Sequence, residues 1–377
     1  MDIVKSCILS IGNELLSGHT LDTNSHAAAK MLTELGTDVF KIMVCDDNFD
    51  RIYEVVTKCK SRILIVSGGL GATHDDITNK VINQLEKDFP YKKRNFSNKL
   101  GSAPGVILED EKQLIFFLPG VPFEYLEMLH EVRNIIISEI KLPIKLRKSF
   151  MTLGQGELKL WEESKLMQKI PSEISVSSLP KSPGVEIIIS TYESEENQKH
   201  FQKAIELIRE NLSEYIFSED GEELIEVVST LLKKNKQTVA VAESCTGGLL
   251  GKIFTDASGS SGYFLGGIIC YSNEAKEKIV GVRQETLEKY GAVSRETAEE
   301  LAIKTRNLFN ADFALSITGI AGPTGGSEEK PVGLVYIGCA SKSGTIVKEF
   351  NFKVDRKMNR VFSATYALKT LHESLKQ

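Results

Sequence analysis

Short apolar segments that end in glycine and polar residues recur along this chain, with helical patterns between them. In the first third, apolar segments at residues 3–11, 39–44 and 63–66 alternate with helical patterns at 24–35 and 49–59. Such alternation is typical of a parallel sheet that is covered by helices on both faces. Because ligands of such folds bind beyond the carboxyl ends of the strands, the glycine-rich strand ends are where functional side chains are expected.

The same pattern divides the 377 residues into three predicted parts. Residues 1–146 and 223–377 both alternate strand and helix signals. Residues 147–222 instead combine a Gly-Gln-Gly turn, a proline-rich stretch and a strand-like run before a helix. We therefore predict an α/β fold with two α/β sandwich domains, whose sheets are mainly parallel, joined by a small α+β module.

Composition and charge exclude several classes of protein. The net charge of −5 argues against direct nucleic-acid binding, which rewards a basic surface. No apolar run approaches the roughly 20 residues of a membrane span, and the start of the chain lacks the pattern of a signal peptide. The six cysteines are scattered, without a C-x-x-C pair. We expect reduced thiols in a cytoplasmic protein.

In the last predicted domain, three polar motifs each follow an apolar strand. They are Glu243–Gly248, Tyr271–Lys276 and Thr318–Pro323. Because strand ends of one parallel sheet meet at one edge, the three motifs are expected to share a crevice. A hydroxyl such as that of Ser244, followed by Gly247, Gly248 and a helix, can point toward the start of that helix. Such a helix start stabilises a phosphate or a developing oxyanion.

A serine becomes a nucleophile at neutral pH only with the help of a base. All six histidines lie outside the three motifs, which argues against a Ser-His-Asp triad. Lys276 is the candidate base, because desolvation can lower the pKa of a lysine. Two alternatives stay open: Ser244 as a helix cap beside a solvated Lys276, and Cys245 as the nucleophile, although we expect this thiol to point into the core.

Five segments of residues 223–377 together resemble the C-terminal domain of the CinA family: AVAESCTGGLL, SGSSGYFLGGIICYSNEAK, LEKYGAVS, ALSITGIAGPTGG and EKPVGLVYI. The resemblance implies a nicotinamide-mononucleotide amidohydrolase of pyridine-nucleotide salvage, which forms nicotinate mononucleotide and ammonia without a cofactor. It also implies a homodimer. The catalytic residues that it implies are Ser244 as nucleophile and Lys276 as base, with Tyr271 and Thr318 as supporting groups. The substrate-binding residues are Thr246, Gly247, Gly248, Gly319 and Arg360, the last of which matches a late arginine that meets the substrate, with the phosphate as its expected contact.

Polar segments also follow the strands of the first domain. They are Ile11–Gly18, Asp46–Asn48, Ser67–Asp76 and Leu118–Pro122. A glycine-rich loop followed by two carboxylates can hold phosphate through its amides and a divalent ion through its acids. An Asp-Asp pair is, however, also common at a helix start.

Together these segments resemble the molybdopterin-binding-like domain that opens full-length CinA proteins. In some relatives this domain is a metal-dependent ADP-ribose pyrophosphatase. The resemblance implies a divalent ion such as Mg²⁺ on Asp75 and Asp76, and nucleotide contacts from Asn13, Glu14, Gly68, Gly69, Gly71 and Thr73. The chain departs from the family in a shorter segment at Lys80–Asn98, before Ala103. This shortening could remove groups that contact the substrate, so pyrophosphatase activity is left open.

Two other functions compete with the amidohydrolase. The first is a pterin-binding or cofactor-handling protein whose first domain carries the activity. The second is a non-enzymatic interaction protein in DNA uptake or damage response. The set of serine, tyrosine, lysine and threonine at strand ends favours an enzyme, and the segment Ser67–Asp76 fits phosphate plus metal at least as well as a pterin.

Overall fold

The computed structural model describes residues 3–71, 77–181 and 183–376, without the side chains of residues 163 and 164. The chain forms two compact units, Met1–Leu146 with Ser190–Phe201, and Arg147–Ile189 with Gln202–Gln377. All six cysteines are free thiols. Within the described ranges, no helix has the length and apolar character that a membrane crossing requires.

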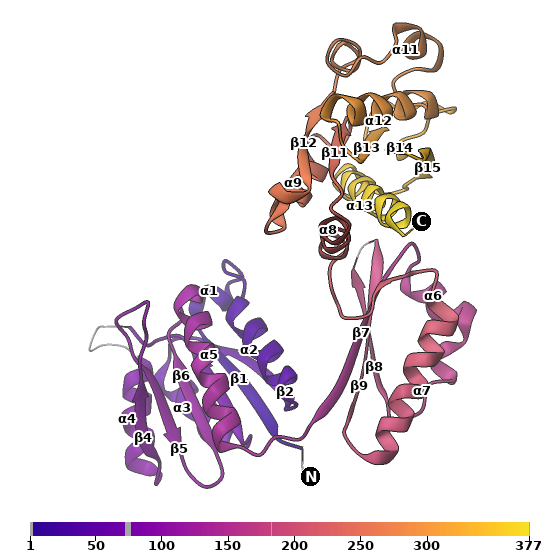
Figure 1. The fold of residues 1–377 in the computed structure, drawn as a ribbon. Coiled ribbons are helices and arrows are strands. Elements are labelled where there is room, and N and C mark those ends of the chain that lie inside the picture. Colours follow the sequence, from indigo (N-terminus) through magenta and orange to yellow (C-terminus); the bar gives the residue numbers. More distant parts are fainter. Residues whose placement is uncertain (1–2, 72–76, 182, 377) are drawn as a thin grey trace. The chain divides into compact units, whose positions relative to one another are not determined.

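The first unit is built on a six-stranded sheet with the order β2-β1-β3-β6-β5-β4 (Figure 1). The strands are β1 (Lys5–Ile11), β2 (Asp38–Cys45), β3 (Ile63–Ser67), β4 (Lys92–Phe96), β5 (Gly105–Glu109) and β6 (Leu114–Leu118). Strands β2, β1, β3 and β6 run parallel, whereas β5 and β4 are antiparallel additions at one edge.

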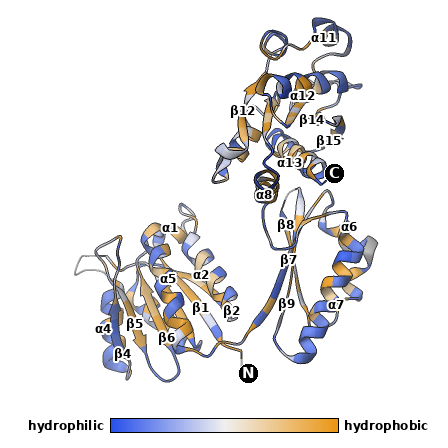
Figure 2. Ribbon diagram, in the orientation of Figure 1, coloured by the Kyte–Doolittle hydropathy of each residue, from blue (hydrophilic) through white to orange (hydrophobic). Residues whose placement is uncertain are grey.

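Helices cover both faces of this sheet. Helices α2 (Thr23–Glu34) and α5 (Pro122–Glu139) pack on one face, and α3 (Phe49–Lys58) and α4 (Ile77–Asp88) on the other. Because both faces are covered, β3 and β6 are buried at every position and read as continuous apolar runs. Figure 2 shows β5 and β6 as hydrophobic over most of their length. A short helix, α1 (Asn13–Leu16), follows β1.

The middle of the chain forms a four-stranded sheet with the order β10-β7-β9-β8. Its strands are β7 (Lys145–Leu153), β8 (Ser175–Lys181), β9 (Gly184–Tyr192) and β10 (Ile216–Ser218). Its helices are α6 (Glu157–Ser164), the 3₁₀ turn η1 (Leu166–Gln168) and α7 (Glu195–Leu212). The burial of β9 alternates from Val185 onward, which is expected for a sheet with one covered face.

The last part of the chain is a five-stranded sheet with the order β12-β11-β13-β14-β15. Its strands are β11 (Val239–Glu243), β12 (Phe264–Ile269), β13 (Phe313–Gly319), β14 (Leu334–Ser341) and β15 (Gly344–Asn351). Its helices are α8 (Leu224–Asn235), α9 (Leu249–Asp256), η2 (Ser260–Gly262), α10 (Asn273–Ala275), the π-helical turn η3 (Lys276–Val280), α11 (Gln284–Tyr290), α12 (Arg295–Phe309) and α13 (Arg356–Leu375).

Strands β12, β11 and β13 are parallel, and β14 and β15 extend the sheet in antiparallel fashion. The registers place Glu243, the last residue of β11, opposite Ile269 of β12 and Ile317 of β13. Three strand ends therefore lie side by side, as expected for a parallel core. The predicted α/β fold class is confirmed.

Candidate active site

Ser244 lies in a tight turn between β11 and α9. Its N–H donates to the Ile317 carbonyl of the neighbouring β13, at 3.0 Å, and its side chain is buried. The chain then reverses through Gly247 and Gly248, whose φ angles are +58° and +93°. Residues with a Cβ adopt such angles rarely, which explains the two glycines. The turn fixes Ser244 at the carboxyl edge of the sheet.

Lys276 reaches this turn from the motif that follows β12. Ser272 caps α10 by accepting a hydrogen bond from Ala275 N–H at 3.0 Å, and the chain continues into η3, which starts at Lys276. The Lys276 side chain is 1% exposed. Its Nζ lies 3.1 Å from Ser244 Oγ. Two motifs that are distant in sequence therefore meet through an amine and a hydroxyl.

Two carbonyl groups complete the surroundings of the Lys276 amine. Nζ donates to the carbonyl oxygens of Cys270, at 2.8 Å, and Tyr271, at 3.2 Å. Burial lowers the pKa of Lys276 below its ordinary value, because an ammonium ion loses its hydration there. A neutral amine has two hydrogens and one lone pair. With both hydrogens on the two carbonyls, the lone pair is left to accept the proton of the Ser244 hydroxyl.

Cys245 follows Ser244 directly but points elsewhere. It packs in a hydrophobic cluster with Leu250 and Phe254 of α9. Burial raises the pKa of its thiol to about 12, so that the thiolate is scarce at neutral pH. This environment argues against Cys245 as the nucleophile.

The main-chain N–H groups at the start of α9 already donate hydrogen bonds within the protein. The carboxylate of Glu243 accepts hydrogen bonds from the N–H groups of Gly248 (3.0 Å), Leu250 (3.0 Å) and Gly251 (2.7 Å). The N–H of Gly247 donates to the Ser244 carbonyl within the turn, at 3.2 Å. The prediction that this helix start receives a phosphate or an oxyanion is therefore wrong for these amides. The Glu243 carboxylate already accepts from three of them, and the Ser244 carbonyl accepts from Gly247.

Arg360 lies near the start of α13 and contacts the same turn. Its guanidinium donates to the Thr246 carbonyl through Nε at 3.2 Å and Nη2 at 2.7 Å. The Thr246 side chain is fully buried, and its Oγ1 has no hydrogen-bond partner among the described residues. Arg360 thus lies next to the proposed nucleophile, where it holds the turn.

The other predicted residues of this site contact groups other than the Ser244 side chain. The Tyr271 side chain is 60% exposed, and its hydroxyl accepts a hydrogen bond from Arg356 at 3.3 Å. The Thr318 hydroxyl donates to the Ala292 carbonyl at 2.6 Å. Gly319 lies close to β14, because a Cβ there would be 2.7 Å from the Leu334 carbonyl oxygen. Tyr271 therefore contacts Lys276 through its main chain, and Thr318 anchors the loop before α12.

Sequence reasoning assigned no role to several groups around this turn. Glu243 is 1% exposed, and Asn359 is fully buried and donates to the Ala321 carbonyl at 2.9 Å. Arg356 donates to the Gly322 carbonyl at 2.6 Å. Glu243 carried one usable signal, an acidic residue that ends an apolar strand before a Gly-Gly turn. Asn359 and Arg356 carried none, because their partners are main-chain carbonyls.

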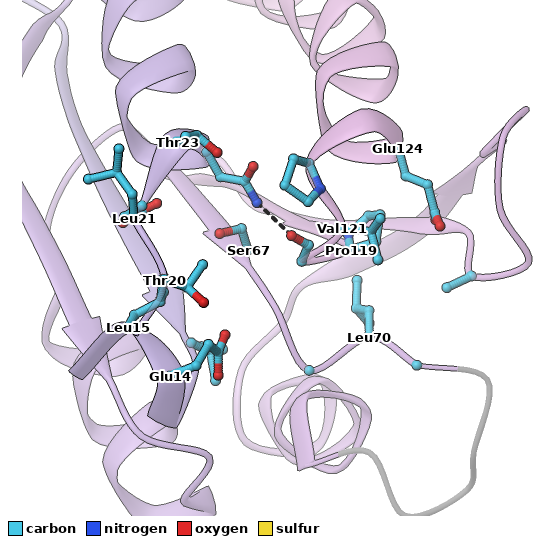
Figure 3. Close-up of a pocket in the computed structure, with 18 of the residues that line it drawn as sticks. Glu14, Leu15, Thr20, Leu21, Thr23, Ser67, Leu70, Pro119, Val121 and Glu124 are labelled. Atoms are coloured by element: carbon cyan, nitrogen blue, oxygen red, sulfur yellow. Dashed lines mark hydrogen bonds between the residues drawn. The ribbon is translucent and has the colours of Figure 1, made fainter. Parts of the chain in front are cut away.

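The first unit has a cavity at the carboxyl ends of β1, β3 and β6 (Figure 3). Its volume is about 480 Å³, within the usual range for small-molecule sites. Glu14 and Glu124 lie on opposite sides of it, with Ser67 between them. Of the predicted residues, Glu14, Gly69 and Gly71 line the cavity.

The remaining predicted residues of the first unit are placed differently. The Asn13 amide group donates to Asp47 Oδ2 at 3.1 Å, on the surface. Gly68 packs against β1, because a Cβ there would be 2.3 Å from the Ile11 carbonyl oxygen. Thr73, Asp75 and Asp76 lie outside the described residues. In the part that is described, no three His, Cys, Asp or Glu side chains gather as a metal site would require.

Comparison with known proteins agrees with both sequence resemblances. The family described as CinA C-terminal domain matches residues 221–375, and that described as Probable molybdopterin binding domain matches residues 7–138. A protein of Thermoanaerobacter sp. (strain X514), named as a competence-damage inducible protein, is 39% identical over 96% of each chain. A CinA-like protein of Kosmotoga olearia is 36% identical over 99% of each.

Among solved structures, the competence/damage inducible protein CihA from Agrobacterium tumefaciens is 38% identical to this chain. The match covers 41% of this chain and 98% of that one, with a TM-score of 0.39. The identity to the two full-length relatives, over nearly the whole of each chain, decides the family. This chain belongs to the CinA family.

Proposed function

We propose that the C-terminal domain hydrolyses the carboxamide of nicotinamide mononucleotide, with Ser244 as nucleophile and Lys276 as base. The observation that carries this proposal is the 3.1 Å distance between Lys276 Nζ and Ser244 Oγ, at a lysine that is 1% exposed. The sequence resemblance to this class of amidohydrolase supplies the substrate. A cytoplasmic homodimer belongs to the same proposal.

The geometry supports a two-step acyl transfer. In the first step, the neutral amine of Lys276 takes the proton of the Ser244 hydroxyl as Oγ attacks the carboxamide carbon. The resulting Lys276 ammonium then gives this proton to the amide nitrogen, the C–N bond breaks, and ammonia leaves. An ester between nicotinate mononucleotide and Ser244 remains.

In the second step, water attacks the ester while Lys276 accepts a proton from it. The proton returns to Ser244 Oγ as the C–O bond breaks, which releases nicotinate mononucleotide. The carbonyls of Cys270 and Tyr271 keep the amine in place in both steps, since they accept its hydrogens in either protonation state. Ser244 and Lys276 therefore suffice for the proton transfers.

The test is incubation of the purified full-length protein with nicotinamide mononucleotide, with ammonia and nicotinate mononucleotide quantified over time. Equal amounts of both products are expected, with and without a chelator, because no proposed step uses a metal. The Ser244→Ala protein is the matched control. Absence of ammonia from the wild-type protein would refute the proposed activity.

A second candidate function rests on the cavity of the first unit. We propose that it binds ADP-ribose, and that Asp75 and Asp76 hold a divalent ion for hydrolysis of the diphosphate. The cavity lies at the ends of β1, β3 and β6, where ligands of such sheets bind. Gly69 and Gly71 bring the main chain to the cavity wall. The described carboxylates do not converge on a metal site, so we derive no step through the ion.

A further inference from the structure

Glu243 carries a buried charge for which the proposed mechanism has no use. It is the last residue of β11 and is 1% exposed. Burial of a carboxylate is costly unless hydrogen bonds replace its water. Glu243 has three such bonds, all from main-chain N–H groups at the start of α9, at 2.7 to 3.0 Å. Among the described residues, all hydrogen bonds of the Glu243 carboxylate thus come from the main chain of residues 248–251.

The main chain of Glu243 is tied to the other half of the site. Its carbonyl accepts a hydrogen bond from Cys270 N–H at 2.8 Å. The carbonyl of Cys270 in turn accepts from Lys276 Nζ at 2.8 Å. One residue therefore connects the helix that ends the Ser244 turn with the strand end that holds the Lys276 amine.

The hydrogen bonds of Glu243 and its neighbours hold both ends of the Ser244 turn. The turn begins at β11, where Ser244 N–H is bound to Ile317, and it ends at α9, where the Glu243 carboxylate binds the N–H groups of Gly248 and Gly251. A carboxylate at a helix N-terminus also interacts favourably with the helix dipole. Both ends of the turn are therefore fixed to the same strand, and Oγ is held toward the amine.

We infer that Glu243 is a positioning residue, whose carboxylate fixes the Ser244 turn relative to Lys276 without contacting the substrate. The inference rests on the proposed function for its turnover readout. Glu243→Gln tests it with little change of shape. A glutamine has one acceptor oxygen and one NH₂ group, and the NH₂ group would face a main-chain N–H. At least one of the three bonds is then replaced by two opposed donors.

The matched control is Glu226→Gln in α8, another carboxylate at a helix start of the same domain. Glu226 Oε2 accepts from Glu223 N–H at 2.7 Å, in a capping box on the exposed surface. Two rates are compared for both variants and the wild type. One is turnover of nicotinamide mononucleotide. The other is phosphonylation of Ser244 by a fluorophosphonate, in which Oγ bonds to phosphorus and fluoride leaves, followed by mass spectrometry of the intact protein.

For Glu243→Gln we expect kcat to fall about tenfold to a hundredfold, which is the effect of a small misplacement of reacting groups. KM and the pKa of the acidic limb of the pH–rate profile should stay unchanged. Phosphonylation of Ser244 should slow by the same factor as kcat. Glu226→Gln should keep the wild-type rates. If Glu243→Gln does not fold, Glu243→Asp is used instead. It keeps the charge but is too short to reach all three amides, so kcat should fall by less than the factor expected for Glu243→Gln.

Four results would overturn the inference: wild-type rates in both Glu243 variants, a change in KM alone, an equal loss in Glu226→Gln, or an unreactive Ser244 in the wild type. A protein that does not hydrolyse the proposed substrate gives a different result. A wild-type protein that releases no ammonia, but whose Ser244 is phosphonylated at least tenfold faster than in Glu243→Gln, supports the positioning role and refutes the amidohydrolase.

Discussion

Arg360 donates two hydrogen bonds from α13 to the carbonyl oxygen of Thr246, two residues beyond Ser244. The Nε and Nη2 atoms make these bonds, whereas Nη1 has no hydrogen-bond partner among the described residues and is available to an anion. A guanidinium beside the nucleophile, with one nitrogen available, suits the phosphate of a nucleotide. The phosphate role that the sequence resemblance implied for Arg360 thus stays a prediction.

We expect wild-type protein to prefer nicotinamide mononucleotide over nicotinamide riboside, and Arg360→Ala to lose about tenfold to a hundredfold of that preference. The measurement is kcat/KM for both compounds. Arg360→Lys, which keeps the charge without the planar fork, should retain part of the preference. A loss of equal size on both substrates would show that Arg360 acts only by holding Thr246.

Replacement of the proposed nucleophile separates Ser244 from its neighbour. Ser244→Ala should lower kcat by about three orders of magnitude or more, as is usual when a nucleophile is lost. Cys245→Ala should stay within a few-fold of wild type, since this thiol is buried and its pKa is raised to about 12. Initial rates of ammonia release measure both effects. The reverse result, with an active Ser244→Ala and an inactive Cys245→Ala, would make Cys245 the nucleophile.

The pKa of Lys276 predicts the pH dependence of the rate. Burial lowers this pKa, and only the neutral amine accepts the serine proton. The value of kcat/KM should therefore fall as pH drops through the lowered pKa, and reach a plateau above it. Lys276→Met, which fits the same space without a base, should lack both the activity and Ser244 acylation. A rate that is constant from acidic to alkaline pH would exclude Lys276 as the base.

Much of this site could be predicted because strand ends are readable in sequence. Apolar strands before Ser244 and Tyr271 indicated one sheet edge, and a parallel sheet brings such ends together whatever lies between them. The directions of side chains could not be predicted in this way. Whether the Thr318 hydroxyl faces Ser244 or the Ala292 carbonyl depends on a loop conformation that periodicity does not encode.

The antiparallel edge of the first sheet shows the same limit for the fold. Strand β4 is largely exposed and has the sequence KKRNF, so it carries no apolar signal, and only its pairing with β5 makes it a strand. The role of Glu243 was hidden for a related reason. A carboxylate beside Gly-Gly is compatible with solvent, metal or helix amides, and only the three distances to α9 decide among them.

His372 of α13 provides a test of the fold at low pH. Its side chain is buried, and desolvation lowers its pKa from 6.5 to about 4. Between these values the unfolded chain binds a proton that the folded chain does not. The free energy of unfolding should therefore decrease as pH falls from 6.5 to about 4, by up to about 3 kcal/mol. Urea unfolding of the wild type and of His372→Gln across this pH range measures this decrease. If the free energy of unfolding depends on pH identically in both proteins, the lowered pKa of His372 is contradicted.

Residues next to the shortened segment line the cavity of the first unit, where the sequence suggested a loss of substrate-contacting groups. The short segment before Ala103 is held by Asn98, whose amide group donates to the Ala103 carbonyl at 3.0 Å and to Glu124 Oε2 at 2.6 Å. Ala103 and Glu124 both line the cavity, so the shortened segment is bound to two of its lining residues. This observation favours retained binding of a nucleotide.

We therefore expect cleavage of ADP-ribose to AMP and ribose 5-phosphate in the presence of Mg²⁺, and none with a chelator. Asp76→Asn should abolish it and leave ammonia release unchanged, while Ser244→Ala should do the reverse, because the two reactions use different domains. Liquid chromatography of the products measures both activities in one sample. Binding of ADP-ribose without cleavage under any divalent ion would refute the pyrophosphatase and leave the cavity as a binding site. The amidohydrolase proposal does not depend on this result, since Ser244 and Lys276 share no group with the cavity.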